Sequence, residues 1–279
     1  MTYAILRDKK YASGRDLGVG LKGVFVEPRG RRPKNDRTLL NWGCVKRPEW
    51  LPQFEGLVLN DFDSVAAASN KLESYRLFSM HEVPTLDFTT ELALAQEWLR
   101  EGNRIFARTK LNASQGAGIT IFDNEEALGL CRAPLFVKEY KKNREYRVHV
   151  LNGEVIDFAQ KRKMGDVRLA DNNINEVDPS IRNHDNGWVF TKSRIDRHED
   201  IDNVAIAAVQ ALGLDFGAVD VLAKWKLSKE ANEHGGKNAL ELKSAVVCEV
   251  NTAPSLSAKS TLDNYIRAFK QYERQENVK

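Results

Sequence analysis

Two apolar stretches near the C-terminal end constrain this chain most, because each places oxygen-bearing side chains inside what should be a buried strand. The first is FGAVDVL at residues 216–222, and the second is VVCEVNTAPSL at residues 246–256. β-Branched and other apolar residues surround the few polar ones, a pattern typical of buried strands. Since side chains alternate along a strand, we expect Glu249 and Asn251 to share one face of the second strand.

Carboxylates enclosed by apolar side chains need partners, because an unpaired buried charge is costly. Asp220, Glu249 and Asn251 together offer three oxygen donors on two strands, which suits a hard divalent cation such as magnesium. The alternative is that Asp220 and Glu249 lie at strand ends, where water solvates them. The pattern of these two stretches is compatible with both interpretations.

Composition narrows the class of protein. The chain has 279 residues, of which 42% are hydrophobic and 29% charged, values typical of a soluble globular protein with one large or two modest domains. A net charge of +3 is too small to imply nucleic acid as a partner. The three cysteines lack CxxC spacing, and no stretch is as long as a membrane span. We therefore expect a cytoplasmic protein without a disulfide scaffold, a structural zinc site or a membrane partner.

A small-residue loop lies in the middle of the chain, between predicted strands at residues 105–110 and 119–122. It contains Ser114, Gly116 and Gly118. Small residues let backbone N–H groups approach phosphate oxygens closely, so this flap is a candidate phosphate-covering loop. A simple flexible hairpin would have the same pattern. Another strand at residues 134–140 follows, and Asn152-Gly153 predicts the turn of a later hairpin.

The remaining segments predict a mixture of helices and strands. Residues 1–63 suggest a small α/β unit, and helices are expected at residues 66–80, 91–100 and 261–275. The densest positive tract, residues 29–37, is either a binding site for phosphate or an acidic substrate, or a solvated loop. His149 alternates with valines and is expected to be a core or edge histidine rather than a base.

In this order the pieces resemble the ATP-grasp superfamily, and within it the ribosomal-protein glutamate ligase-like carboxylate–amine ligases. The resemblance covers roughly residues 60–258 and is strongest in GAVDVL and EVNTAPSL near the C-terminus. It implies an α+β fold in which two α+β subdomains grip ATP. A small α/β domain at residues 1–63 would precede an ATP-grasp domain at residues 64–279. Within the latter we expect a flap subdomain at about 103–140 and a C-terminal subdomain at about 141–260.

The resemblance also implies a role for each matching residue. The metal ligands would be Asp220, Glu249 and Asn251. ATP would contact Lys71, Arg108 or Lys110, Ser114, Gly116, Gly118, Lys138, Glu139, Tyr140, Glu145 and Arg147. The γ-phosphate or acyl phosphate would be held by Arg162, Arg182 and Asn183. The family usually has lysine followed by proline near Arg108 and Lys110, so either of these two residues could contact the α- and β-phosphates.

The activity implied by the resemblance is a ligation that uses ATP and one or two Mg²⁺ ions, with Mn²⁺ as an alternative. A small-molecule or peptide carboxylate would form an acyl phosphate, which an amine would convert to an amide. Two alternatives stay open. One is an ATP-grasp kinase acting on a small molecule, and the other is a non-catalytic nucleotide- or RNA-binding module that uses residues 29–37. Nucleic acid is the less expected partner, and the aromatic-rich last helix is compatible with an oligomer.

Overall fold

A small parallel sheet, with strands between residues 2 and 59, forms the N-terminal unit of the protein. The computed structural model describes residues 2–8, 11–113, 117–164, 182, 187–227 and 240–276. The sheet has the order β2-β1-β3-β4. Its strands are β1 (Thr2–Arg7), β2 (Val24–Val26), β3 (Arg37–Trp42) and β4 (Val58–Leu59), accompanied by helix α1 (Ala12–Gly20) and the short 3-10 helix η1 (Leu51–Gln53). β3 is buried almost throughout, as expected for a central parallel strand.

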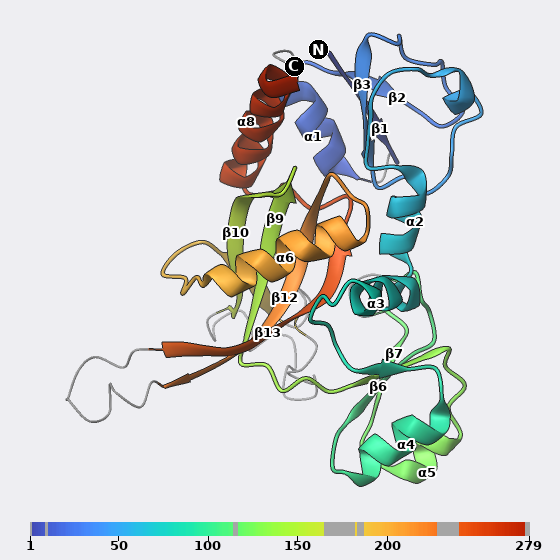
Figure 1. Ribbon diagram of the computed structural model, residues 1–279, viewed down its shortest axis with the longest axis vertical. Helices are drawn as coiled ribbons and strands as arrows, with labels where there is room; N and C mark the ends of the chain where they lie inside the picture. The colour runs from blue at the N-terminus through green and yellow to red at the C-terminus, as the bar shows by residue number, and fades with distance from the viewer. Residues whose placement is uncertain are drawn as a thin grey trace, which may run out of the picture.

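The flap is an antiparallel sheet at the opposite end of the molecule from the N-terminal unit (Figure 1). Its order is β5-β8-β6-β7, and its strands are β5 (Phe88–Thr89), β6 (Ile105–Arg108), β7 (Ile119–Phe122) and β8 (Leu135–Lys138). Helices α4 (Leu92–Arg100) and α5 (Glu125–Gly129) pack on it. The pairing of β6 with β7 confirms the predicted strand–loop–strand arrangement. Ser114 and Gly116 lie outside the described residues.

The central sheet is antiparallel and carries both of the apolar C-terminal stretches. Its order is β11-β10-β9-β12-β13. The strands are β9 (Arg144–Leu151), β10 (Glu154–Lys163), β11 (Trp188–Thr191), β12 (Phe216–Leu227) and β13 (Leu240–Asn251), and helix α6 (Glu199–Ala211) crosses one face (Figure 1). Asn152 and Gly153 both have positive φ angles, 49° and 76°, which confirms the predicted tight turn between β9 and β10.

The helix expected at residues 66–80 is broken into α2 (Phe62–Ser69) and α3 (Lys71–Met80). Asn70 separates them with an extended backbone, and its side chain accepts hydrogen bonds from the amides of Leu72 and Glu73. The prediction of a single helix was wrong, because the asparagine side chain accepts hydrogen bonds from nearby backbone amides and so favours the N-cap of a new helix. The break puts Lys71 at the first position of α3.

Asn70→Ala should reduce the free energy of unfolding by about 1 kcal/mol, because the first amides of α3 would lose their acceptor. Chemical denaturation monitored by circular dichroism measures this change. Asn70→Asp, which keeps an acceptor at the cap, is the matched control and should remain close to the wild type. An equal loss in both variants would contradict the capping role.

The last helix, α8 (Lys259–Glu276), fastens the N-terminal unit to the central sheet. Trp42 stacks on Phe216 with ring centroids 5.4 Å apart, and Phe269 packs edge-on against Phe216 at the same distance. α1 and α8 lie side by side (Figure 1). A Cβ atom on Gly20 would lie 2.2 Å from Cδ1 of Ile266, so a larger residue here would displace the end of the Ile266 side chain. No helix among the described residues is both long and apolar enough to span a membrane.

Candidate functional site

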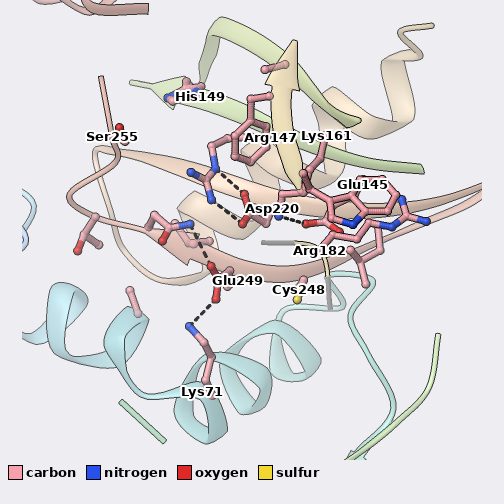
Figure 2. A pocket seen from close by; sticks show the side chains of 18 of the residues that line it. Lys71, Glu145, Arg147, His149, Lys161, Arg182, Asp220, Cys248, Glu249 and Ser255 are labelled. Atoms are coloured by element: carbon pink, nitrogen blue, oxygen red, sulfur yellow. Dashed lines mark hydrogen bonds and ion pairs between the residues drawn. The ribbon is translucent and has the colours of Figure 1, made fainter. Parts of the chain in front are cut away.

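A cavity of about 1590 Å³ is lined by residues of the N-terminal unit, the flap and the central sheet. Strand β9 runs along it, and Glu145, Arg147 and His149 all line it. These residues share a face because side chains alternate along a strand, with successive members about 6.8 Å apart. β9 therefore supplies three polar positions in a row, and Figure 2 shows them with the surrounding side chains.

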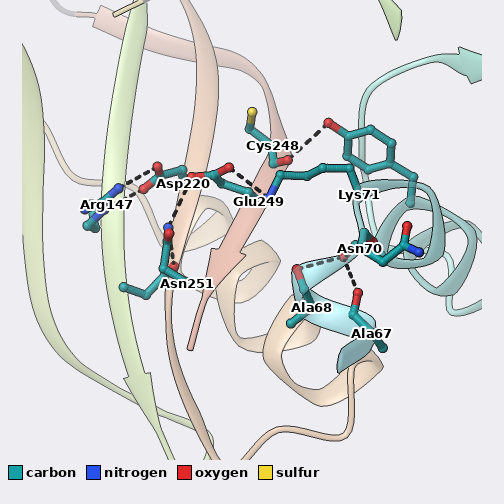
Figure 3. Close-up of polar contacts among 12 residues, drawn as sticks. Ala67, Ala68, Asn70, Lys71, Arg147, Asp220, Cys248, Glu249 and Asn251 are labelled. Carbon is teal, nitrogen blue, oxygen red and sulfur yellow. Dashed lines mark hydrogen bonds and ion pairs between the residues drawn. The ribbon is translucent and has the colours of Figure 1, made fainter. Parts of the chain in front are cut away.

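The centre of the cavity contains the three residues predicted to bind metal. Asp220 on β12 lies in register with Arg147 on β9 and with Glu249 on β13. Nε and Nη2 of Arg147 donate to the two carboxylate oxygens of Asp220, each at 2.7 Å. The Asn251 amide donates to Glu249 Oε1 at 3.3 Å. Figure 3 shows that the three oxygen-bearing side chains converge across the neighbouring strands β12 and β13.

Helix α3 presents Lys71 to this centre. Lys71 is only 7% exposed, and its Nζ lies 3.0 Å from Glu249 Oε2 (Figure 3). One turn further along, the Tyr75 hydroxyl donates to the Cys248 carbonyl at 3.2 Å. The two contacts fix α3 against β13, and they bring the predicted ATP-contacting lysine to one of the predicted metal ligands.

The two central carboxylates differ in their electrostatic surroundings. Burial opposes ionisation of Glu249, but the positive charges of Lys71, Arg147 and Arg108 outweigh it and hold the pKa of Glu249 well below its ordinary value. Burial raises the pKa of Asp220, although Arg147 opposes the shift. Glu249 is therefore ionised at physiological pH, and Asp220 is the more readily protonated of the two.

Solved structures share this architecture. A D-alanine–D-alanine ligase from Bacillus anthracis matches with a TM-score of 0.60 and 14% identity, over 99% of each chain. A RimK domain protein from Sphaerobacter thermophilus, described as ATP-grasp, has a TM-score of 0.60 and 12% identity over 96% of this chain and 99% of that one. A RiPP-associated ATP-grasp ligase from Chryseobacterium gregarium, solved with ADP and a leader and core peptide, has a TM-score of 0.57 and 11% identity over 95% of each chain.

The chain has the ATP-grasp fold. This confirms the α+β fold class expected from the sequence, and the match spans the N-terminal unit as well as the flap and central sheet. At these identities the likeness concerns the fold alone. No protein-family model matches the sequence, and no curated protein is detectably similar to it.

One end of the ATP-grasp cavity contains several of the residues predicted to bind ATP. Glu145 is 5% exposed and pairs with Lys161 and with Lys142, whose Nζ is 3.0 Å away. Burial opposes the charge of Glu145, but these two lysines lower its pKa. Lys138, Glu139 and Tyr140 line the same cavity. The Glu139 backbone amide donates to the Arg104 carbonyl at 2.9 Å, so an adenine ring beside Glu139 would have to hydrogen-bond to other groups.

Arg108 and Lys110, the two candidates for contact with the α- and β-phosphates, lie differently relative to the cavity. Arg108 lines the cavity, and its buried Nε has no hydrogen-bond partner among the described residues. Neither Lys110 nor Gly118 is among the described residues that line it. Arg108 is therefore the better placed of the two to contact a phosphate.

The three residues predicted to hold the γ-phosphate differ in their positions relative to the cavity. Arg162 is not among the described residues that line the cavity, and it donates to Gln160 Oε1 at 3.2 Å and to the Arg194 carbonyl. Its neighbour Lys161 lines the cavity instead, because side chains alternate along β10. Arg182 lines the cavity, with its guanidinium 4.4 Å from the ring centroid of Trp188. Asn183 lies outside the described residues.

The opposite end of the cavity was not predicted from the sequence. Its lining residues come from the starts of α1 and α8 and from β11, and they include Tyr11, Ala12, Ser13, Lys192, Ser257, Ala258, Ser260 and Thr261. The run of hydroxyl residues after Pro254 is the one local signal that could have indicated it. Their meeting depends on contacts between segments far apart in the chain.

Because the pKa of His149 is lowered in the folded protein, we expect the protein to lose stability in weak acid. Burial, and then the positive charge of Arg147, lower the pKa of His149 to about 3, against about 6.5 for an unfolded chain. Below pH 6.5 the unfolded chain therefore binds a proton that the folded chain does not. Between pH 7 and pH 5 this residue should remove about 2 kcal/mol from the free energy of unfolding. Denaturation at both pH values, compared with His149→Gln, measures the effect, and identical losses in the two proteins would contradict it.

Proposed function

We propose that this protein is an ATP- and magnesium-dependent carboxylate–amine ligase. The observation that carries the proposal is the charge distribution of the cavity. Its described lining contains nine lysine and arginine side chains and four carboxylates, and two of those carboxylates, Asp220 and Glu249, face each other at the centre. An excess of positive charge around a central acidic pair suits a polyanion that arrives with a divalent cation.

The donor set at the centre fits magnesium. The described residues contain no group of three or more His, Cys, Asp or Glu side chains that could hold a metal by themselves. Magnesium needs no such group, since it is usually bound by one or two carboxylates together with substrate phosphates. Asp220, Glu249 and Asn251 would hold it. When bound, magnesium disperses the negative charge of the phosphates during transfer.

The protein's own contribution is alignment and charge neutralisation. Lys71, Arg108 and Lys161 surround the centre from three different elements, and they would hold phosphate oxygens. A carboxylate oxygen of the acid would attack the γ-phosphorus, and the bond to the bridging oxygen of ADP would break. The amine nitrogen would then attack the acyl carbon, phosphate would leave, and the amine proton would pass to solvent. No side chain needs to act as a nucleophile in this sequence of steps.

Comparisons support the same class of reaction. The structures with this fold include D-alanine–D-alanine ligase and a ligase solved with ADP and peptide, so small-molecule and peptide acids are both suitable candidates. None of residues 29–37, the tract proposed for binding RNA, is among the described residues that line the cavity.

The test is a turnover screen. The purified chain is incubated with ATP and Mg²⁺ against pools of acids and amines, and ADP, phosphate and products are measured. We expect ADP and free phosphate only where an acid and an amine are both present, and EDTA should abolish their release. A stable phosphorylated product that forms without an amine would identify a kinase instead. Failure to bind Mg²⁺–ATP would overturn the proposal.

A further inference from the structure

The end of the cavity around His149 has no part in the ATP chemistry described above. Figure 2 shows His149 and Ser255 on one side of the Arg147–Asp220 pair, with Glu145 and Lys161 on the other. Along β9 this end lies one same-face position beyond Arg147, a distance of about 6.8 Å. All four carboxylates of the described lining belong to the centre or to the other end.

His149 offers a hydrogen-bond donor to this end. It is 3% exposed, and its Nδ1 lies 3.0 Å from the hydroxyl oxygen of Tyr265. Tyr265 is fully buried, and His149 is its one acceptor among the described residues, so the tyrosine hydroxyl must donate to Nδ1. The imidazole is then neutral and carries its proton on Nε2. That N–H has no partner among the described residues, while His149 lines the cavity.

Helix α1 begins at the same end of the cavity. Tyr11 makes no side-chain cap, and the first turn of α1 contains no acidic residue. Tyr11, Ala12 and Ser13 all line the cavity. The first amides of a helix have no partner within the helix, and they carry its partial positive charge. The Ser13 hydroxyl oxygen accepts from Trp42 Nε1 at 3.1 Å, which leaves the hydroxyl hydrogen free to donate.

Helix α8 begins beside α1, and Lys192, directly after β11, adds a cation. Its first turn contains no acidic residue, and Ser260 there lines the cavity. Lys192 on the other side reaches the Ser260 hydroxyl at 3.0 Å and Asp157 at 2.6 Å. Asp157 is not among the described lining residues and also accepts from Asn264 at 3.2 Å. Hydrogen-bond donors thus face this end from β9, α1 and α8. The nearby carboxylate, Asp157, already pairs with Lys192.

We propose that this end binds an oxyanion of the substrate, a carboxylate or phosphate separate from the reacting carboxylate. The inference rests on the proposed function, because the reacting group would lie at the Asp220–Glu249 centre. The substrate would then carry two anionic groups, with the second roughly one same-face step of β9, about 7 Å, beyond the first. His149 Nε2, the first amides of α1 and the hydroxyls of Ser13 and Ser260 would hold that second group.

The test uses the full chain with Mg²⁺ and a non-hydrolysable ATP analogue, so that the other end is occupied. Inorganic phosphate and succinate are added in separate titrations, followed by calorimetry and by the ¹⁵N and ¹H resonances of the His149 ring. We expect saturable binding of at least one probe and a shift of the His149 Nε2–H resonance. The tighter probe identifies the oxyanion as phosphate or carboxylate. Failure of both probes to shift that resonance would overturn the inference.

Ala12→Pro removes one donor amide from the start of α1. Proline is tolerated at the first helical position, and Tyr11 before it is already extended, with φ −93° and ψ 97°. The variant should weaken probe binding by about tenfold. Glu125→Pro, at the first position of α5 in the flap, is the matched control and should bind as the wild type does. Equal affinity in both variants would remove α1 from the site.

Binding of the ATP analogue is measured in the same preparations. If the analogue binds and neither oxyanion does, the further inference is wrong and the ligase proposal stands. If the analogue itself does not bind, the proposed function fails. His149→Gln, which keeps a neutral N–H donor, should retain probe binding, whereas His149→Leu should lose it without loss of the analogue. Retention in His149→Leu would contradict the role of this side chain.

Discussion

Glu249→Gln should lower magnesium-dependent ATP turnover by about a thousandfold, because Glu249 is the ionised carboxylate between the predicted metal position and Lys71. Glutamine keeps the shape and an acceptor for Lys71, but it removes the negative charge that a divalent cation requires. Release of ADP with saturating acid and amine measures the effect, and circular dichroism checks that the variant is folded.

A control for this variant lies on the same strand. Glu241 is exposed near the start of β13 and pairs with Lys226 at 3.2 Å, far along the strand from the cavity. Glu241→Gln removes the same charge from β13 and should leave turnover unchanged. Full activity in Glu249→Gln would contradict the role of Glu249 in the metal site. An equal loss of turnover in both variants would show that the effect comes from the net charge of the protein rather than from the position of Glu249.

Phe216→Ala should reduce the free energy of unfolding by about 4 kcal/mol. Phe216 is fully buried where three parts of the chain meet, against Trp42 of the N-terminal unit and Phe269 of α8. Alanine would leave a cavity that none of these parts can close alone. Since they share this core, we also expect a single unfolding transition in denaturant, seen equally by tryptophan fluorescence and circular dichroism.

Phe25→Ala is the matched control for this prediction. Phe25 lies on the edge strand β2 of the N-terminal unit and is 44% exposed, so its loss should cost less than about 1 kcal/mol. Two separate transitions in the wild type would mean that the N-terminal unit unfolds independently of the central sheet, and they would contradict the shared core around Phe216.

Local patterns explain which parts of the fold could be predicted. The buried strands around Asp220 and Glu249, the turn at Asn152 and the two flap strands follow from alternation and turn preference, which neighbouring residues determine. The break at Asn70 depends on a competition between capping and helix continuation, and both choices are compatible with the sequence nearby.

The position of Lys161 shows why part of the site escaped prediction. A bulge between Val155 and Asp157 shifts the register of β10 against β9. Side chains beyond the bulge therefore change faces relative to those before it, and a shift of one residue in the register exchanges Lys161 for Arg162 at the cavity. The sequence contains no signal strong enough to place that bulge.

The sequence by itself determined that two apolar strands near the C-terminal end carry two acids and an amide, because the apolar pattern around these residues is local. Only the tertiary structure decided that Arg147 pairs with Asp220, that Lys71 reaches Glu249, and that the starts of α1 and α8 meet beside His149. Those contacts join segments separated by tens to hundreds of residues, and the packing of a shared core selects them rather than any preference of the residues nearby.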